Sequence, residues 1–417
     1  MLYIIDCIVA FIIFMDTNFL SVIPVGDFAY SVMGYKNKVL LTIICVLMFV
    51  FSLLYRSYYR KKITYNFSGF ILLLVGITIV LTIYSAEIYD QSITAGFKMS
   101  YYFMIPLIYY LFTLYFSTPN RVKYFTNLMV FMGTIYSGII ILQVLLLKVS
   151  SIIFLNFNEQ GLGLLEYRSY GIRLSKPADF ITLSFLFTCL AIYSSSRKKN
   201  VLLYSAVFIQ FIYISLVSMT RLSMIICVAL FVLTMIFKTD LKSKIKSRVY
   251  VLLLLLIAGL FGGEIINNLL YGQQDRMNSA LIRTDAIQYF RNQMFSHGVF
   301  GRGFPTDAKY YFFNHGPEGR FFTTDLGVYG FITIYGVAGI IIVMLLLYKL
   351  VQAYLRTRGD RYNRGMITLV LVYLLLSAPT LFLFDAQRIL YLPILLSLID
   401  MFILKANSSI ELDKYSL

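Results

Sequence analysis

Residues 67–85 read FSGFILLLVGITIVLTIYS, an apolar run without one charged side chain. About 20 apolar residues are enough to cross the hydrocarbon core of a bilayer as a helix. Similar runs recur along the whole chain, so that 59% of its 417 residues are hydrophobic. Only 13% of the residues are charged, whereas a soluble domain carries about a quarter. The sequence therefore predicts a polytopic membrane protein built from α-helices.

Twelve such runs follow one another, and we expect an all-α bundle of about twelve transmembrane helices. The predicted spans are residues 2–22, 38–55, 67–85, 99–117, 125–147, 178–194, 201–219, 222–238, 249–268, 325–348, 366–384 and 387–404. Residues 1–417 then form a single transmembrane domain, from which no soluble domain can be separated. The polar residues 405–417 are expected to form a flexible cytoplasmic tail.

Positive charge falls on alternate loops between these spans. One set of loops, together with both termini, holds 21 of the 36 Lys and Arg residues and 5 acidic residues. The other set holds 15 basic and 14 acidic residues, and Asp6 lies inside the first span. Cytoplasmic loops are enriched in Lys and Arg, so we assign the first set and both termini to the cytoplasm. The basic charge is better explained by orientation and anionic lipid than by nucleic acid.

Several function classes find no support in the sequence. It contains no GxxxxGK[ST] phosphate loop, no GxSxG nucleophile motif and no HExxH zinc motif. The four cysteines lie inside apolar runs and show no metal-ligand spacing. They are expected to be small packing residues. We therefore expect neither a metal site nor a cofactor.

Two loops on the non-cytoplasmic side are long, residues 148–177 and 269–324, and long loops in compact proteins usually carry function. We expect the second to form a periplasmic subdomain. Within it, SALIRTDAIQYFRNQM (279–294) has the spacing of an amphipathic helix, with Ser279 as a plausible N-cap. Its apolar stripe is expected to lie at the membrane–water boundary. A stretch rich in Tyr and Phe, residues 310–313, follows.

Nine of the 15 basic residues on the non-cytoplasmic side are arginines. Arginine binds phosphate oxygens with two hydrogen bonds and tolerates partial desolvation better than lysine. Arg221 lies in the hairpin LVSMTRLSMII, where a charge is costly unless it is solvated, paired or bound to an anion. The alternative is an arginine that snorkels to the lipid headgroups.

Arg283 and Arg291 are eight residues apart and share roughly one helical face, which could bind an anion or be an ordinary solvated face. Arg388 at the start of the last span is expected to anchor that helix at the membrane boundary. The other candidates for binding an anionic substrate are Arg173, Lys176, Arg302 and Arg320.

Two residues are the leading candidates for acid–base chemistry. Asp325 begins the tenth predicted span and could either cap its helix or deprotonate a sugar hydroxyl. His315 is one of only two histidines, and histidine titrates near neutral pH. Its alternative is an exposed loop position without a catalytic role. Which of the two residues acts as a base stays open at this stage.

Four segments, taken in order, resemble the bacterial O-antigen polymerase and ligase superfamily. YGIRL (170–174) resembles its arginine-containing segment before a middle span, and SMTR (218–221) resembles its hairpin. Residues 283–303 resemble the arginine-bearing helix of its large periplasmic loop. DLGVYGFITIYGVAG (325–339) resembles its closing signature, in which His or Asp precedes G-x-x-G. The resemblance covers roughly residues 165–345.

The resemblance favours a polymerase, because Asp325 stands eleven residues before Gly336 where ligases carry a histidine. It implies an inverting, metal-independent glycosyltransferase that joins undecaprenyl-pyrophosphate-linked repeat units at the periplasmic face of the bacterial inner membrane. By this resemblance Arg221 and Arg283 grip the donor pyrophosphate, and Asp325 deprotonates or orients the acceptor hydroxyl. Arg173 and Arg291 would assist, and a chain-length regulator protein is an expected partner.

Two alternatives stay open. One is an O-antigen ligase that transfers polysaccharide to the lipid A core. The other is a flippase for lipid-linked oligosaccharides. Transporters tend to have two related halves and charges near the membrane midplane. The two halves of this sequence do not resemble each other, which favours an enzyme.

Overall fold

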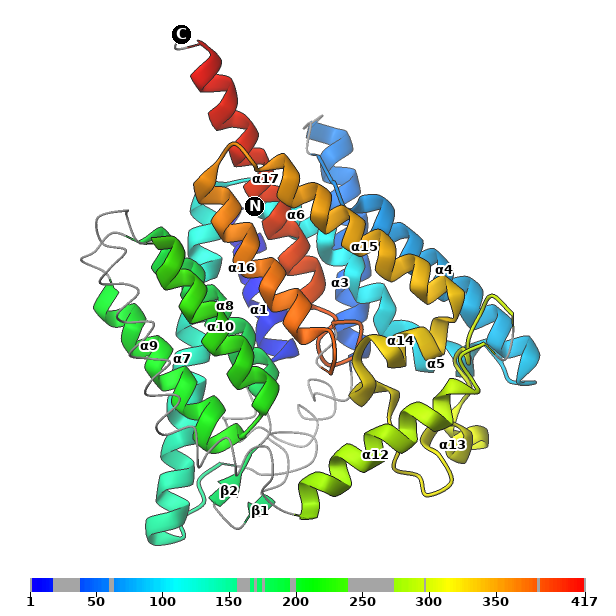
Figure 1. Ribbon diagram of the computed structural model, residues 1–417. Helices are drawn as coiled ribbons and strands as arrows, with labels where there is room; N and C mark the ends of the chain where they lie inside the picture. The colour runs from blue at the N-terminus through cyan, green and yellow to red at the C-terminus, as the bar shows by residue number, and fades with distance from the viewer. Residues whose placement is uncertain are drawn as a thin grey trace.

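The computed structural model describes residues 2–17, 38–59, 64–155, 166–168, 171–174, 177–195, 200–238, 274–295, 298–380 and 383–415. Within these residues the protein is a bundle of α-helices, as expected (Figure 1). The sheet content of this part is one antiparallel hairpin, in which β1 (Glu166–Arg168) pairs with β2 (Gly171–Arg173).

Seven helical stretches among the described residues are long and apolar enough to cross a membrane. They are α3 (Val39–Tyr59), α4 (Ser68–Ile88), the run of α5 (Ile93–Ser100), η2 (Tyr101–Ile108) and α6 (Tyr109–Phe116), α7 (Pro119–Ser150), α9 (Asn200–Ile212) with η4 (Tyr213–Ser218), α10 (Arg221–Lys238) and α15 (Val337–Arg356). All seven overlap predicted spans, although α15 begins 12 residues after the start of the predicted span 325–348 and ends 8 residues after its end. The predicted span 249–268 lies outside the described residues, and a total of twelve spans stays a prediction.

Four further helices complete the described bundle. They are α1 (Leu2–Asp16), α8 (Ala178–Ser194), α16 (Arg361–Ser377) and α17 (Tyr391–Tyr415). Helix α17 continues into the segment that we expected to be a flexible tail. The two marked ends of the chain lie toward the upper end of the bundle, and α12 (Gln274–Arg291) and the β-hairpin lie at the opposite end (Figure 1).

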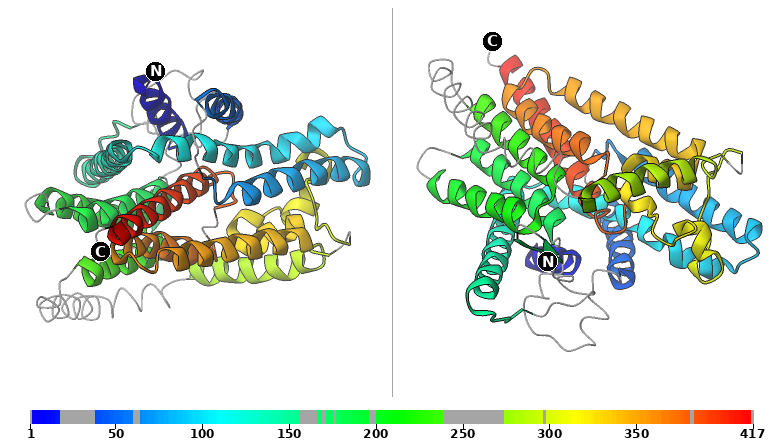
Figure 2. Two further views of the ribbon diagram at one scale, coloured as in Figure 1. Left: turned by 90° about the horizontal axis from the view of Figure 1, so that it is seen from above. Right: turned by 60° about the horizontal axis from the view of Figure 1, so that its bottom comes forward.

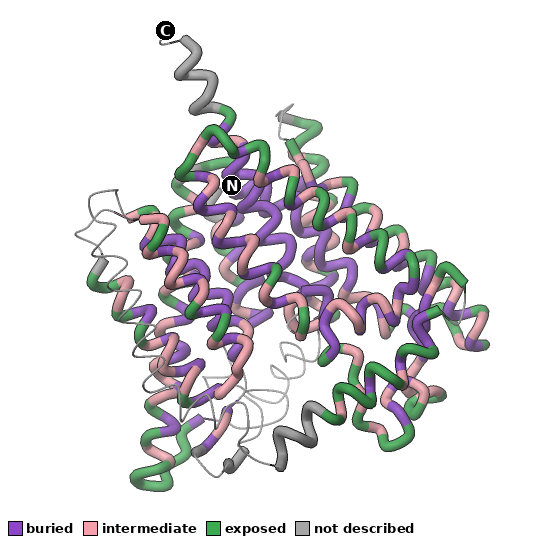
Figure 3. The backbone as a smooth tube through the Cα atoms, viewed as in Figure 1, coloured by how far each residue is buried: buried purple, intermediate pink, exposed green. Residues whose placement is uncertain are grey.

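The centre of the bundle is formed by α8 and α17. Every residue from Phe180 to Ile192 and from Tyr391 to Ile403 is buried, and Figure 3 shows this buried core between more exposed outer helices. A helix that is apolar on all sides has to be enclosed by other helices. By contrast, α3, α4 and α15 expose large apolar side chains such as Leu54, Ile83 and Met344. Such outer surfaces fit contact with lipid chains.

The predicted span 325–348 is not one helix. It consists of η6 (Thr323–Leu326), α14 (Gly327–Tyr335) and then α15, and the break falls at Gly336 with a φ of +64°. A side chain at Gly336 would collide with the backbone of Phe300 and Gly301, so only glycine allows this turn. The break aims the start of α14 away from the axis of α15 (Figures 1 and 2).

The long predicted loop contains two helices, α12 and α13 (Asp307–His315). The predicted amphipathic helix is therefore present, although it begins at Gln274 and not after Ser279. Two residues of its apolar stripe, Ala286 and Phe290, are buried, because they pack on Leu326 in a small core that is separate from the core of the bundle. This packing fixes α12 against η6 and α14 at one end of the bundle (Figure 1).

Candidate functional site

A buried ion-pair network lies in the turn between α16 and α17. Arg388 Nε donates to Asp179 Oδ2 at 2.8 Å, and Arg388 Nη1 lies 3.2 Å from Asp385 Oδ2. The side chains of Arg388 and Asp385 are only 11% and 7% exposed. Buried charges are stable only when they are paired. Arg388 is thus not a boundary anchor, because it ties the start of α8 to the turn before α17.

A second buried pair adjoins this network. Lys38 Nζ lies 2.8 Å from Asp16 Oδ1 and donates to the backbone oxygen of Gln387 at 3.0 Å. Burial raises the pKa of the Asp385 carboxyl, and the positive charges of Arg388 and Lys38 oppose that shift. Arg388 therefore pairs with this buried carboxyl group, and Lys38 adds positive charge at longer range.

Asp325 comes close to the same network from η6. Desolvation raises the pKa of its carboxyl, while Arg283 and then Arg388 act in the opposite direction. The residue still has exposed surface, and its carboxyl makes no hydrogen bond with a described residue. Neither η6 nor α14 has a side-chain N-cap, so Asp325 does not cap a helix here. Arg283 and Arg388, which lie on two other elements, therefore place positive charge within electrostatic range of Asp325.

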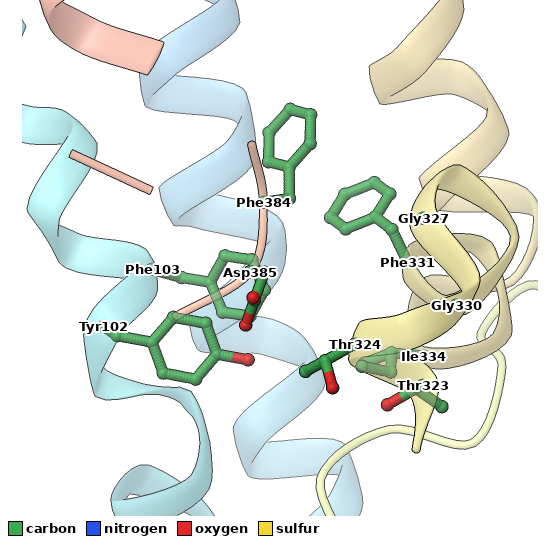
Figure 4. A pocket seen from close by; sticks show the side chains of 10 residues that line it. All are labelled: Tyr102, Phe103, Thr323, Thr324, Gly327, Gly330, Phe331, Ile334, Phe384 and Asp385. Carbon is green, nitrogen blue, oxygen red and sulfur yellow. The ribbon is translucent and has the colours of Figure 1, made fainter. Parts of the chain in front are cut away.

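A small cleft opens beside these charges. Its walls include polar side chains from Tyr102, Thr323, Thr324 and Asp385, and apolar side chains from Phe103, Phe331, Ile334 and Phe384 (Figure 4). The cleft volume is about 40 Å³, enough for roughly one water molecule or one hydroxyl group. Oδ2 of Asp385 is buried and lies 3.2 Å from Arg388 Nη1, in an ion pair without the geometry of a hydrogen bond. The cleft therefore borders the carboxyl group of a buried ion pair.

The β-hairpin packs on the turn that leads into α10. The Leu174 amide donates to Val217 O at 3.1 Å, and Arg173 Nε donates to Ser218 O at 3.0 Å. Met219 has a φ of +54° at this turn, and Arg221 begins α10. Arg173 and Arg221, predicted from separate segments, therefore meet at one hairpin.

This hairpin is electrostatically linked to the ion-pair network. The Tyr213 hydroxyl is within electrostatic range of both Asp179 and Arg173. Asp179 in turn pairs with Arg388. The hairpin and the ion-pair network are therefore neighbours through the uncharged Tyr213 hydroxyl. Lys176 lies outside the described residues.

Two predicted substrate-binding arginines remain at the surface. Arg291 is exposed at the end of α12 and acts electrostatically on the Tyr329 hydroxyl. Arg320 is also exposed and forms an ion pair with Glu318. Neither is brought to Asp325 by a described contact.

Arg302 and His315 make their contacts with other residues of the long loop. Arg302 is 7% exposed, its Nη1 donates to Asn314 O at 3.1 Å, and its guanidinium lies 5.1 Å from the centre of the Phe290 ring. Desolvation lowers the pKa of Arg302 to about 10. His315 Nε2 lies 3.3 Å from Asp307 Oδ1, and its Nδ1 lies 3.3 Å from Phe321 O. Both side chains support the loop's own packing.

Sequence reasoning missed Asp179, Asp385 and Arg388 as members of a common site. A signal was present, since two opposite charges three residues apart stand between two apolar runs at Asp385 and Arg388. Charges at such a position need partners. The pairing with Asp179, 209 residues away, could not be inferred from local sequence.

No group of three or more His, Cys, Asp or Glu side chains within the described residues is arranged to hold a metal ion. No family model matches the chain, and a search of curated proteins finds no match.

Proposed function

We propose that this protein is a glycosyltransferase that polymerises undecaprenyl-pyrophosphate-linked oligosaccharide repeat units into O-antigen or a related surface polysaccharide. The observation that carries the proposal is the positive charge that Arg283 and Arg388 place within electrostatic range of Asp325 at one end of an apolar bundle. A carboxyl group beside guanidinium groups suits a reaction between a sugar hydroxyl and a lipid-linked pyrophosphate.

In the proposed reaction, the acceptor hydroxyl oxygen forms a bond to the anomeric carbon of the donor sugar. The bond from that carbon to the pyrophosphate oxygen breaks, and the electron pair leaves with the pyrophosphate. The hydroxyl proton passes to the Asp325 carboxylate. Attack opposite to the leaving group inverts the anomeric centre. The carrier pyrophosphate then departs with its lipid.

The charged residues have distinct parts in this proposal. A raised pKa makes the Asp325 carboxylate a stronger base than an ordinary aspartate. Arg283 and Arg221 would stabilise the negative charge that develops on the pyrophosphate. Arg173 and Arg291 would hold the donor, while Arg388 keeps the turn before α17 in place through Asp179.

We also propose an orientation of the protein in the membrane. The site would face the periplasm from the bacterial inner membrane, and both termini would lie in the cytoplasm, as the uneven distribution of Lys and Arg favours. A chain-length regulator is an expected partner, and no metal is required. The runner-up is a ligase that transfers finished polysaccharide to the lipid A core.

The direct test is a gel of surface lipopolysaccharide from a deletion strain, with the wild-type or the Arg221→Lys gene returned. We expect a single repeat unit on the core in the deletion strain and a ladder with the wild-type gene. Arg221→Lys keeps the charge but loses two-point binding of phosphate, so it should give no ladder at normal protein level.

Other patterns would contradict the proposal. Bare core with polymer on the lipid carrier would indicate a ligase. Bare core with single units retained on the cytoplasmic face would indicate a flippase. An unchanged ladder with Arg221→Lys would remove Arg221 from the mechanism.

A further inference from the structure

A second cavity lies on the other side of α12 from Arg283. Its volume is about 380 Å³, within the range of cavities that hold small organic ligands. One wall is α12, and the other is the segment 317–321 that follows α13. The cavity does not share a lining residue with the cleft beside Asp385.

Three polar side chains of α12 line this cavity and are exposed, namely Asp285, Gln288 and Asn292. Their spacing of three and four residues puts them on one helical face. None of the three makes a hydrogen bond with a residue that the structure describes. Each amide offers two donors and an acceptor, and the carboxylate offers acceptors. The wall can therefore form several hydrogen bonds with a ligand rich in hydroxyl groups.

The same cavity has an aromatic side. The rings of Tyr289 and Phe321 lie 5.6 Å apart between centroids, and both residues line the cavity. The Tyr289 hydroxyl donates to Phe312 O at 3.1 Å, which fixes the ring. The negative face of an aromatic ring attracts polarised C–H groups, such as those of a sugar ring.

The charge of the cavity argues against a phosphate ligand. Its one guanidinium, from Arg320, already forms an ion pair with Glu318. Asp285 adds a negative charge that would repel a pyrophosphate. The polar groups, the aromatic side and the charge together favour a saccharide without phosphate groups.

We propose that this cavity is a saccharide subsite, which rests on the proposed function and would hold part of the growing polysaccharide. Ala286 and Phe290, buried beneath α12, separate the face with Arg283 from the face with Asn292. The diameter of a helix with its side chains is about 10–12 Å. The subsite thus lies about one helix width from Arg283, so one glycan could reach both.

The test uses the full-length protein in detergent, titrated calorimetrically with lipid-free polysaccharide released by mild acid from the surface of the producing strain. The variant is the double substitution Gln288→Ala and Asn292→Ala, which keeps good helix formers on an exposed face. The matched control is Ile287→Ala, an exposed residue of α12 outside the cavity lining. Loss of two hydrogen bonds should weaken binding about tenfold or more.

The control should bind as the wild-type protein does, and the double variant should also make shorter polymer chains in cells. Equal binding by the double variant and the wild type would overturn the subsite, and so would an equal loss of affinity in Ile287→Ala.

The subsite can fail separately from the proposed function. A normal ladder with wild-type gene and unchanged binding by the double variant would reject the subsite alone. Glycan binding that depends on Asn292 and Gln288, in a strain that makes polymer without this gene, would reject the polymerase alone.

Discussion

Arg283 and Arg302 lie in the same long segment and were both predicted to bind substrate, but the structure gives them opposite surroundings. Arg283 is exposed on α12 and acts on the carboxyl of Asp325. Arg302 is buried against Phe290 and donates to the backbone oxygen of Asn314. An arginine with an exposed guanidinium opposite a carboxyl group can meet a substrate. One enclosed by its own loop supports that loop.

The largest expected effect comes from Arg283→Gln. This variant removes a positive charge from the site without removing packing, so we expect polymer formation to fall by about 100- to 1000-fold. Thermal unfolding should stay close to that of the wild-type protein, because exposed substitutions rarely change stability by more than about 0.5 kcal/mol. Initial rates with purified lipid-linked repeat units would measure the first effect. Normal rates would show that Arg283, like Arg302, has no direct part in the reaction.

The second effect is a loss of stability, and two substitutions at Arg302 measure it. Arg302→Ala leaves a cavity under Phe290 and removes a hydrogen bond, so it should lower stability by about 2–4 kcal/mol. Arg302→Met fills most of that space without a buried charge and should be far less harmful. Thermal unfolding in detergent measures both variants.

Activity separates the two roles of Arg302. If Arg302 only supports the loop, Arg302→Met should retain activity within about threefold of the wild type. Loss of activity in stable Arg302→Met protein would show that the guanidinium itself meets the substrate.

The third and smallest effect is a shift in pH dependence. A base works only when it is deprotonated, so activity should fall as the pH drops through the raised pKa of Asp325. Arg283 opposes the rise in this pKa more strongly than Arg388 does. Arg283→Gln should therefore raise the pKa further and move the acid limb of its residual activity to higher pH. Rates measured across pH would detect this shift.

Two variants control for charge in this experiment. Arg283→Lys keeps the positive charge and should leave the acid limb in place. Arg320→Gln removes a charge that pairs with Glu318 and does not act on Asp325, so it should also leave the limb in place. A shift of the same size in Arg320→Gln would mean that net charge, and not Arg283, sets the pKa.

The apolar runs predicted the helices well, because hydrophobic length is a local property of the chain. Residues 67–85 became α4, and the amphipathic pattern near Ala286 became α12. The break at Gly336 was missed, since it depends on the approach of Phe300 and Gly301 from another segment. Periodicity alone cannot reveal such a contact.

The site was predictable in part for the same reason. Asp325 and Arg283 were each recognisable as charges on the outer loops, but their proximity depends on how α12 packs on Leu326. Arg302 was a weaker candidate than Arg283 for binding an anionic substrate, although both are arginines of the same outer loop. The two arginines differ in burial. Arg302 is buried because it packs on Phe290, and the local sequence does not indicate this contact.

The most direct test of the central claim is polymer formation by the purified protein in proteoliposomes that contain only lipid-linked repeat units. Wild-type protein and His315→Ala should both produce a ladder, because His315 is engaged with Asp307 and the backbone of Phe321. Asp325→Asn should reduce polymer formation by about 100-fold or more, since the amide cannot accept the proton. A ladder of wild-type intensity from Asp325→Asn, or none from the wild-type protein, would contradict the account.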